Sequence, residues 1–405
     1  MQTQITPAYL ETPEGQAADQ ILRSCVHCGF CTATCPTYQL LGDELDSPRG
    51  RIYLIKQMLE GHEVSDKTRL HLDRCLTCRS CETTCPSGVQ YGKLIDIGRE
   101  LVEKNTNRSL PAQFIRYALR KIIPFPGRFA MLLRLGNLVK PVLTPGLKRK
   151  LPQVSKPVSY KLQQHARRML VLDGCAQSVA TAQTNAAAVR ILDYLNIQLI
   201  SADRAGCCGA VSQHLSATDE AKDFMRRNID AWWPFIDEGV EAIIVTASGC
   251  GVMVKDYGHL LKDDPGYADK AKQVSQLAKD ISEVLVNEKL DALAKRSAKR
   301  VAFHSPCTLQ HGQQITGVVE SILTRAGFTL TEVNNSHLCC GSAGTYSILQ
   351  PVLSQQLLTN KLANLNRGKP EVIVTANVGC QMHMATKSDL PVRHWIELLA
   401  EMIDP

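Results

Sequence analysis

Eight of the sixteen cysteines form two blocks of identical spacing near the start of the chain. The first block consists of Cys25, Cys28, Cys31 and Cys35, followed by Pro36. The second consists of Cys75, Cys78, Cys81 and Cys85, followed by Pro86. Three thiolates at successive C-x2-C spacings can reach three corners of one cubane, and this run is typical of proteins that hold two [4Fe–4S] clusters.

The fourth cysteine of each block precedes a helix-breaking proline and is expected to point toward the other cluster. The predicted ligands of cluster 1 are Cys25, Cys28, Cys31 and Cys85. Those of cluster 2 are Cys75, Cys78, Cys81 and Cys35. Zinc is the alternative, but zinc sites favour paired C-x2-C motifs, which a third cysteine at the same spacing fits poorly. His27 lies between two ligands and is expected to shape the loop or donate a hydrogen bond rather than bind iron.

The other eight cysteines lie beyond residue 170 and form an internal repeat. The first copy contains Cys175, Cys207, Cys208 and Cys250. The second contains Cys307, Cys339, Cys340 and Cys380. Equivalent cysteines are 130 to 132 residues apart, and each copy includes a Cys-Cys-Gly sequence. An iron–sulfur cluster is the favoured occupant of each copy, with zinc and metal-free thiol chemistry as the alternatives.

The segments around these cysteines predict an α/β fold. Apolar, β-branched runs precede Cys175, Cys250, Cys307 and Cys380. Helical patterns follow at 185–195 and 316–327. Strands that alternate with helices form a mostly parallel sheet, whose ligands bind at the carboxyl ends of the strands. The single cysteines lie at those ends, so four thiols of each copy are expected to converge.

The pattern divides the chain into four parts. Residues 1–105 are expected to form a mainly helical, ferredoxin-like domain with two clusters, with helices at 48–60 and 90–103. Residues 106–165 form a basic connector. The two α/β repeats follow at 166–300 and 301–405.

The composition and the first residues of the chain indicate the cellular compartment. The chain is 44% hydrophobic and 21% charged, as in globular proteins. Its polar beginning lacks the features of a secretory signal, and no stretch resembles a membrane-spanning helix. We therefore expect a cytoplasmic protein with reduced thiols, in which clustered cysteines bind metal rather than form disulfides.

The connector has an unusual charge. Residues 104–172 contain fifteen Lys and Arg and no Asp or Glu, whereas the rest of the chain has 31 basic and 39 acidic residues. Basic amphipathic helices are expected at 112–123 and 128–139. They could lie on a membrane surface, dock on an acidic partner, or pack on the second half with their charges outward. Nucleic acid is not expected, because no recognition motif accompanies the charge.

The whole chain resembles the iron–sulfur subunits of flavin-dependent hydroxyacid and glycerol-phosphate dehydrogenases and of heterodisulfide reductases. The longer stretches at 23–56, 71–89, 205–215, 228–234 and 336–351 are most similar to the iron–sulfur subunits of bacterial glycolate oxidase. This resemblance implies an electron-transfer subunit beside two FAD-containing subunits that oxidise glycolate to glyoxylate. It also implies a peripheral place on the cytoplasmic face of the inner membrane and electron delivery toward quinone.

The repeats depart from the heterodisulfide reductase pattern, in which a fifth cysteine follows the fourth by three positions. Met253 and His383 occupy that position here, which puts a non-cubane cluster in question. The possible further ligands or proton donors in the second copy are His304, His311, His337 and His383. The glycine-rich run 341–346 is expected to let the backbone approach the site beside Cys340.

Three rival functions remain. The chain could serve a related lactate or glycerol-3-phosphate dehydrogenase. It could reduce a heterodisulfide or quinone at its Cys-Cys-Gly sites, or it could be a zinc-stabilised docking subunit. No flavin site and no catalytic Ser/His/Asp set is recognisable, so substrate oxidation is expected in the partner subunits.

Overall fold

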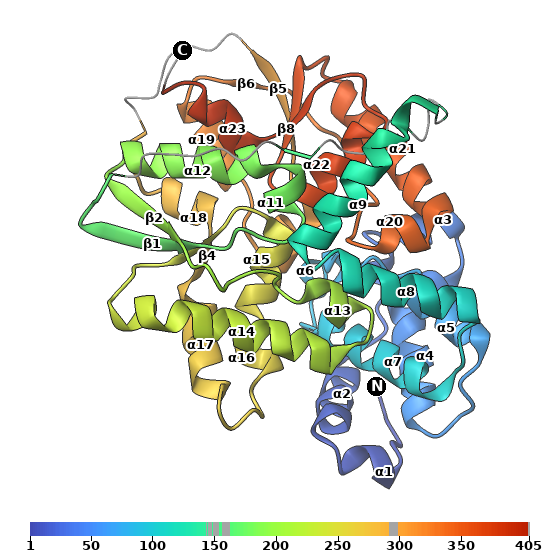
Figure 1. The fold of residues 1–405 in the computed structure, drawn as a ribbon. Coiled ribbons are helices and arrows are strands. Elements are labelled where there is room, and N and C mark those ends of the chain that lie inside the picture. Colours follow the sequence, from blue (N-terminus) through green and yellow to red (C-terminus); the bar gives the residue numbers. More distant parts are fainter. Residues whose placement is uncertain (143, 145–147, 149–153, 156–162, 291–298, 404–405) are drawn as a thin grey trace.

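A helical N-terminal region leads into two parallel sheets (Figure 1). The computed structural model describes residues 1–142, 144, 148, 154–155, 163–290 and 299–403. Most of the second half of the predicted connector, between 143 and 162, lies outside the described residues.

The N-terminal region consists of short helices around the two cysteine blocks. They are α1 (Pro7–Leu10), α2 (Pro13–Ser24), α3 (Pro36–Leu41), α4 (Pro48–Leu59), α5 (Asp66–Asp73), α6 (Ser80–Thr83) and α7 (Tyr91–Asn105), with 3₁₀ turns η1 (Phe30–Thr32) and η2 (Glu44–Asp46). Proline opens α4, and the Ser47 side chain accepts from Gly50 N at its N-terminus. Leu22, Ile55 and Leu94 are fully buried where α2, α4 and α7 meet. The two predicted helices, 48–60 and 90–103, are confirmed within two residues.

The connector begins with two helices that run along the outside of the molecule. They are α8 (Leu110–Ile122) and α9 (Pro126–Leu138), followed by the 3₁₀ turn η3 (Lys140–Val142). Both begin two residues before the predicted limits and end one residue before them. Pro126 opens α9, which explains the break between the two helices.

The first repeat is a four-stranded parallel sheet in the order β2-β1-β3-β4. Its strands are β1 (Arg167–Val171), β2 (Ile197–Ser201), β3 (Ile243–Val245) and β4 (Ala278–Asp280). Its helices are α11 (Gln177–Ala180), α12 (Ala182–Tyr194), α13 (Ala210–His214), α14 (Thr218–Asp237), α15 (Ser248–Lys255), α16 (Tyr257–Leu260), α17 (Ala268–Leu277) and α18 (Ile281–Leu285). Every residue of β3 is buried, as expected for a strand covered on both faces.

The second repeat has the equivalent strand order, β6-β5-β7-β8. Its strands are β5 (Arg300–His304), β6 (Thr329–Leu330), β7 (Val372–Thr375) and β8 (Val392–His394). Its helices are the π-helical turn η5 (Thr308–Gly312), α19 (Val318–Arg325), α20 (Tyr346–Leu349), α21 (Pro351–Asn366), α22 (Val378–Ala385) and α23 (Trp395–Ala400). The strands predicted before the four single cysteines are therefore β1, β3, β5 and β7.

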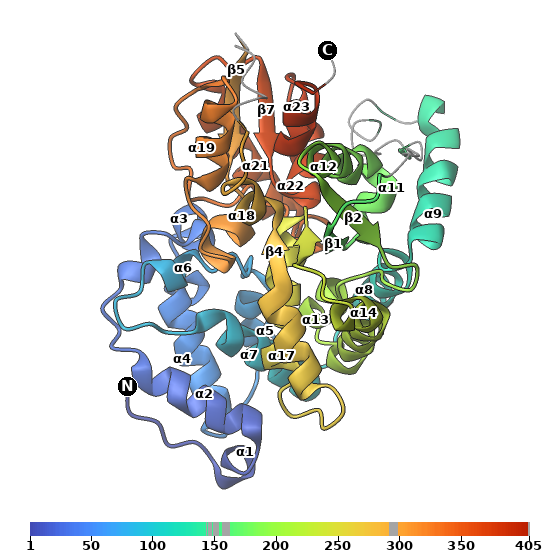
Figure 2. The same ribbon diagram turned by 90° about the vertical axis from the view of Figure 1, so that its left-hand side faces the viewer.

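The two sheets share one hydrophobic core. It joins Val171 and Ile244 of the first sheet to Val301 and Val374 of the second, with α12 packed against α23 between them. Separate clusters cover the outer face of each sheet, under α14 to α17 in the first repeat and under α21 and α22 in the second. Figure 2 shows the N-terminal region below the second repeat, with α8 and α9 on the side of the first.

Candidate iron–sulfur centres

The first of two small cavities in the N-terminal region lies close to the surface. Its lining includes the predicted cluster 1 ligands Cys25, Cys28, Cys31 and Cys85, together with Cys81. Cys28 is exposed, and the neighbouring Val26 and Phe30 are 65% and 60% exposed. His27 is exposed in a left-handed conformation with φ of 55°. A cluster at this position would lie within reach of a redox partner.

The second cavity lies beside a buried cation. Its lining includes the predicted cluster 2 ligands Cys35, Cys75, Cys78 and Cys81. Nη1 of the buried Arg51 lies 4.0 Å from Cys35 Sγ, and Arg51 is paired with the fully buried Asp46. Tyr91 donates to Cys75 Sγ at 3.7 Å. Sequence reasoning missed all three of these polar residues, because nothing local in the sequence shows that they are buried.

The donor sets suit clusters that carry their own positive charge. Burial raises the pKa of the Cys81 thiol well above its usual value, and Cys78 and Cys75 raise it further. Burial also raises the pKa of Cys31 to about 11. Thiols packed together in this way ionise readily only when a cation balances them, as iron would do. Cys85 lines the first cavity and Cys35 lines the second, so each lies beside cysteines of the other block, and the two ligand sets stay predictions.

The Cys-Cys-Gly turns have the same geometry in both repeats. Gly209 and Gly341 have φ of 91° and 88°. Their amides donate to Cys207 Sγ and Cys339 Sγ, each at 3.4 Å. Both turns also contact a helix, α14 in the first repeat and α21 in the second. A Cβ on Gly209 would lie 3.0 Å from Ala221 O, and one on Gly341 would lie 2.6 Å from Ser354 O. Glycine therefore serves the contact with the helix as well as the approach to the sulfur.

The four thiols of each repeat converge at the carboxyl ends of the strands. In the first repeat each thiol interacts with the next one in the series Cys175, Cys207, Cys208, Cys250. In the second the order is Cys307, Cys339, Cys340, Cys380. Cys307 Sγ and Cys339 Sγ are 3.8 Å apart. Seven of these eight side chains are buried, and Cys250 is half-buried, so each set can hold a metal centre away from solvent.

The surroundings of the two thiol sets differ. Gly209 packs on Ala221 and Gly341 packs on Ser354, so these contacts align α14 with α21. In this alignment Asn228 in α14 corresponds to Lys361 in α21. The Asn228 amide donates to Cys207 O at 2.9 Å. The buried Lys361 ammonium donates to the carbonyls of Asn335 and Ser336 at 3.0 and 3.2 Å. The second repeat thus has a cation where the first has a neutral amide.

The four histidines of the second repeat have separate positions. His304 is buried beside Cys340 and Cys380, and its Nε2 has no hydrogen-bond partner among the described residues. His311 contacts Thr83 through Nδ1 and His337 O through Nε2. The His337 side chain is half-buried. His383 is within 3.1 Å of Ser354 Oγ. The structure therefore brings His304 to the thiols.

The second cysteine block is packed directly onto the second repeat. Leu76 and Cys78 share a buried apolar cluster with Cys307, Cys339 and Tyr346. Burial raises the pKa of Cys78, and the charge of Cys307 raises it further. The contact joins the second cysteine block of the N-terminal region to the Cys-Cys-Gly site of the second repeat.

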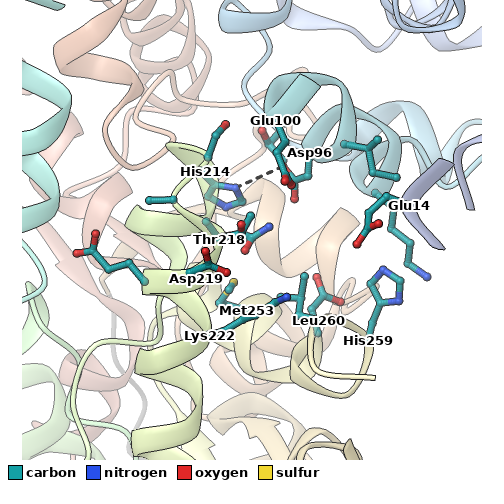
Figure 3. Close-up of a pocket in the computed structure, with 18 of the residues that line it drawn as sticks. Glu14, Asp96, Glu100, His214, Thr218, Asp219, Lys222, Met253, His259 and Leu260 are labelled. Atoms are coloured by element: carbon teal, nitrogen blue, oxygen red, sulfur yellow. Dashed lines mark ion pairs between the residues drawn. The ribbon is translucent and has the colours of Figure 1, made fainter. Parts of the chain in front are cut away.

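The first repeat faces the N-terminal region across a polar cleft. This cleft of about 1110 Å³ runs between α2 and α7 on one side and the helices α13 to α16 on the other (Figure 3). Its walls carry charges of both signs, among them Glu14, Asp219 and Lys222, and Asp96 pairs with His214 at 3.8 Å. The thiols of the first repeat are covered instead by the connector, through Ile123 and Phe125 against Phe224.

The charges of α8 are directed inward. Arg116 pairs with Asp73 at 3.2 Å, and Arg120 and Lys121 both pair with Glu220. This is the reverse of the alternative in which the helix packs with its charges outward. Four of its large apolar side chains are exposed, and exposed side chains of α9 and its C-cap continue the surface. They are Leu110, Phe114, Ile115, Tyr117, Met131, Leu132, Leu135, Leu138 and Val139.

Known proteins with the same arrangement agree with this reading. A 4Fe-4S dicluster domain model matches residues 21–89, and a cysteine-rich domain model with the Cys-Cys-Gly signature matches 169–255 and 301–385. The glycolate oxidase iron–sulfur subunit of Escherichia coli is 56% identical over 405 residues, the full length of both chains. This chain belongs to the glycolate oxidase iron–sulfur subunits. It is thus an electron-transferring subunit of an oxidoreductase complex.

Two further matches are more distant. A probable glycolate oxidase iron–sulfur subunit of Bacillus subtilis is 31% identical over 395 residues, with 90% of this chain and 88% of that protein covered. A crystal structure of a hypothetical protein from Helicobacter pylori has a TM-score of 0.54 at 10% identity, and it covers 99% of this chain and 73% of its own. That likeness supports the fold alone. Among the described residues, no helix is long and apolar enough to cross a membrane.

Proposed function

We propose that this chain takes electrons from two FAD-containing subunits that oxidise glycolate to glyoxylate and passes them one at a time toward quinone. The full-length identity of 56% to a glycolate oxidase subunit supports glycolate as the substrate. The flavin collects two electrons together, and iron–sulfur centres accept them singly. The proposed units are the parts 1–105, 106–165, 166–300 and 301–405.

Electrons enter at cluster 1, pass to cluster 2, continue to the second repeat and reach the first repeat last. The contact of Leu76 and Cys78 with Cys307 and Cys339 is the observation that carries this order. Entry at cluster 1 is supported by the exposed Cys28 and its apolar neighbours Val26 and Phe30. In this proposal each repeat holds an iron–sulfur centre bound by its four cysteines.

Freeze-quench EPR of the complex with glycolate tests the order. In Cys340→Ser the two N-terminal clusters become reduced at the normal rate, but the centre of the first repeat does not. Cys208→Ser is the matched control at the same place in the first repeat. It leaves reduction of the second repeat intact. Reduction of the first repeat at the normal rate in Cys340→Ser would contradict the proposed order.

The substrate requires its own measurement. We expect the anaerobically purified complex to reduce its iron–sulfur centres with glycolate much faster than with lactate or glycerol 3-phosphate. Faster reduction by either of the other two compounds would assign the chain to a related dehydrogenase. Iron and acid-labile sulfide in the second half, rather than zinc, are expected in the same preparation.

We further propose that the apolar surface of α8 and α9 lies on the membrane, where quinone would be available. Nine large apolar side chains are exposed on this surface. Because Arg116, Arg120 and Lys121 are paired within the protein, binding is expected to depend on apolar insertion more than on lipid charge. Aromatic side chains at Phe114 and Tyr117 suit the interfacial layer.

Vesicle co-sedimentation distinguishes this surface from a protein-docking surface. The complex is expected to bind vesicles of neutral phosphatidylcholine, with little change between low and high salt. The double variant Phe114→Asp/Leu138→Asp should lose binding, whereas Val352→Asp, at an exposed position on α21, should retain it. If vesicle binding is absent and the double variant instead loses the partner subunits, this surface binds protein.

A further inference from the structure

His304 ends strand β5 inside the second repeat. It is 2% exposed, and its ring lies against the thiols, with the ligand atoms of His304, Cys340 and Cys380 all within 4.8 Å of one another. The Nε2 atom has no hydrogen-bond partner among the described residues. A buried ring nitrogen without a partner is costly unless another group occupies the space that it faces.

The other nitrogen of the ring is already engaged. His304 Nδ1 lies 2.9 Å from Thr375 Oγ1 in β7. A metal-binding histidine commonly donates its second N–H to an oxygen in this way, which fixes the ring and leaves the first nitrogen with a free lone pair. The hydrogen bond to Thr375 therefore engages Nδ1 and leaves the Nε2 lone pair available to a metal beside Cys340 and Cys380.

The first repeat has no histidine at the equivalent position. The residue three positions before its first cysteine is Leu172, where the second repeat has His304. Thr246, which corresponds to Thr375, hydrogen-bonds instead to the Asn185 amide at 2.6 Å. The threonine is common to both repeats, but only the second repeat uses it to hold an imidazole.

We propose that His304 Nε2 is a fifth ligand of the metal centre in the second repeat and binds one of its iron atoms. The donor set is then four thiolates and one nitrogen, against four thiolates in the first repeat. The inference rests on the proposed function, because it requires an iron–sulfur centre at this site.

His383 is the natural competitor for this role. It occupies the position of the fifth cysteine in heterodisulfide reductases, so the resemblance alone would favour it. Its Nε2, however, lies 3.1 Å from Ser354 Oγ, and Ser354 also donates to Gly341 O. The geometry assigns His383 to the support of the Cys-Cys-Gly turn and His304 to the metal.

Pulsed EPR on the full chain, labelled with ¹⁵N-histidine and purified anaerobically with its copurifying subunits, tests the assignment. The wild type and His383→Leu are expected to show the strong hyperfine coupling of a directly bound nitrogen. His304→Leu, which copies Leu172 of the first repeat, should lose that coupling. His304→Cys restores a donor and should keep the wild-type iron content without the coupling, which covers the case in which His304→Leu loses the metal.

The outcomes separate this proposal from the one on which it depends. Coupling that persists in His304→Leu, or that disappears in His383→Leu alone, overturns the assignment of His304. Iron beyond the content of two cubanes, without any histidine coupling in the wild type, overturns the histidine ligand and leaves the electron-transfer proposal intact. If the iron content does not exceed that of two cubanes, the proposed centres in the repeats and the proposed histidine ligand are both wrong.

Discussion

The two Cys-Cys-Gly repeats have the same strand order and the same glycine turns, but their thiols have different neighbours. Leu172, Asn228 and Met253 in the first repeat correspond to His304, Lys361 and His383 in the second. Each difference adds a nitrogen that can be ionised or can bind metal. A repeated backbone thus fixes where four thiols meet, whereas the buried groups around them give each centre its own chemistry.

The coverage of the two sites differs as well. The N-terminal region covers the second site with Leu76 and Cys78, whereas Ile123 and Phe125 of the connector cover the first. One site therefore adjoins a redox domain and the other adjoins the exposed apolar surface of α8 and α9. This difference lets two similar domains take successive places in one electron route.

Substitution of the turn glycines is expected to have the largest effect, and it tests the backbone conformation that the two repeats share. Gly341→Ala is expected to destabilise the chain by about 3–5 kcal/mol, because it combines a positive φ with a Cβ 2.6 Å from Ser354 O. Gly209→Ala, with 3.0 Å to Ala221 O, should lose about 2–3 kcal/mol. Anaerobic urea unfolding measures both values.

Gly344→Ala is the control for backbone conformation alone. It also has a positive φ, but nothing lies within 4 Å of its Cβ, so a loss of only about 1 kcal/mol is expected. Equal losses in all three variants would show that the contact with α14 or α21 does not determine the need for glycine.

The two repeats should respond to acid in opposite directions. Asp280 and His394 begin equivalent helices, α18 and α23. Burial raises the pKa of Asp280 to about 6, so its folded form takes up a proton first and stability rises as the pH falls through that value. Burial lowers the pKa of His394 to about 3, so the stability that it contributes above pH 6.5 is lost as the pH falls.

Asp280→Asn isolates the first of these effects. At pH 7.5 the variant is expected to be about 1–3 kcal/mol more stable than the wild type, because it removes a buried charge and keeps the oxygen that accepts from Ser282 N. The difference should shrink by pH 5.5. Thermal unfolding across this range measures it, and a difference that grows toward low pH would show that the sign is wrong.

The smallest expected effect is the change in reduction potential when the Lys361 ammonium is removed. Burial lowers its pKa, and the nearby thiols of the second repeat oppose that shift. Lys361→Asn gives the second repeat the residue of the first and should lower the potential of its centre by roughly 50–100 mV, as expected for one charge nearby at moderate dielectric. A redox titration followed by EPR measures the shift.

An exposed lysine of the same repeat controls for net charge. Lys387→Asn removes a charge that is screened by solvent, and its effect on the potential should be small. If Lys387→Asn and Lys361→Asn shift the potential equally, the buried lysine does not set the difference between the repeats.

The sequence was sufficient for features that depend on spacing. The cysteine intervals predicted two blocks and two repeats, and the apolar runs predicted the strands β1, β3, β5 and β7. Pro126 and the helical patterns located α8 and α9 within two residues. These features are local, because each depends on residues a few positions apart or on a regular period.

Features that depend on long-range packing could not be predicted in the same way. The pairing of Arg116 with Asp73 turns charges of α8 inward, unlike the alternative in which they face outward, and no local pattern indicates which charges have partners. His304 could not be separated from His311, His337 and His383, because the ring that reaches the thiols is selected by the hydrogen bond to Thr375. The contact between cluster 2 and the second repeat likewise joins distant segments.

That contact also has a consequence for synthesis of the chain. Thr83 and His311, which meet across it, are 228 positions apart. At ribosomal rates the second repeat emerges roughly ten to fifty seconds after the N-terminal region. During this interval the second repeat does not yet bury Leu76 and Cys78. This surface of the N-terminal region is therefore exposed to oxygen and to other nascent chains. The second cysteine block is therefore a point at which cofactor insertion must be timed with translation, and slow synthesis of the last hundred residues would leave it vulnerable to oxidation.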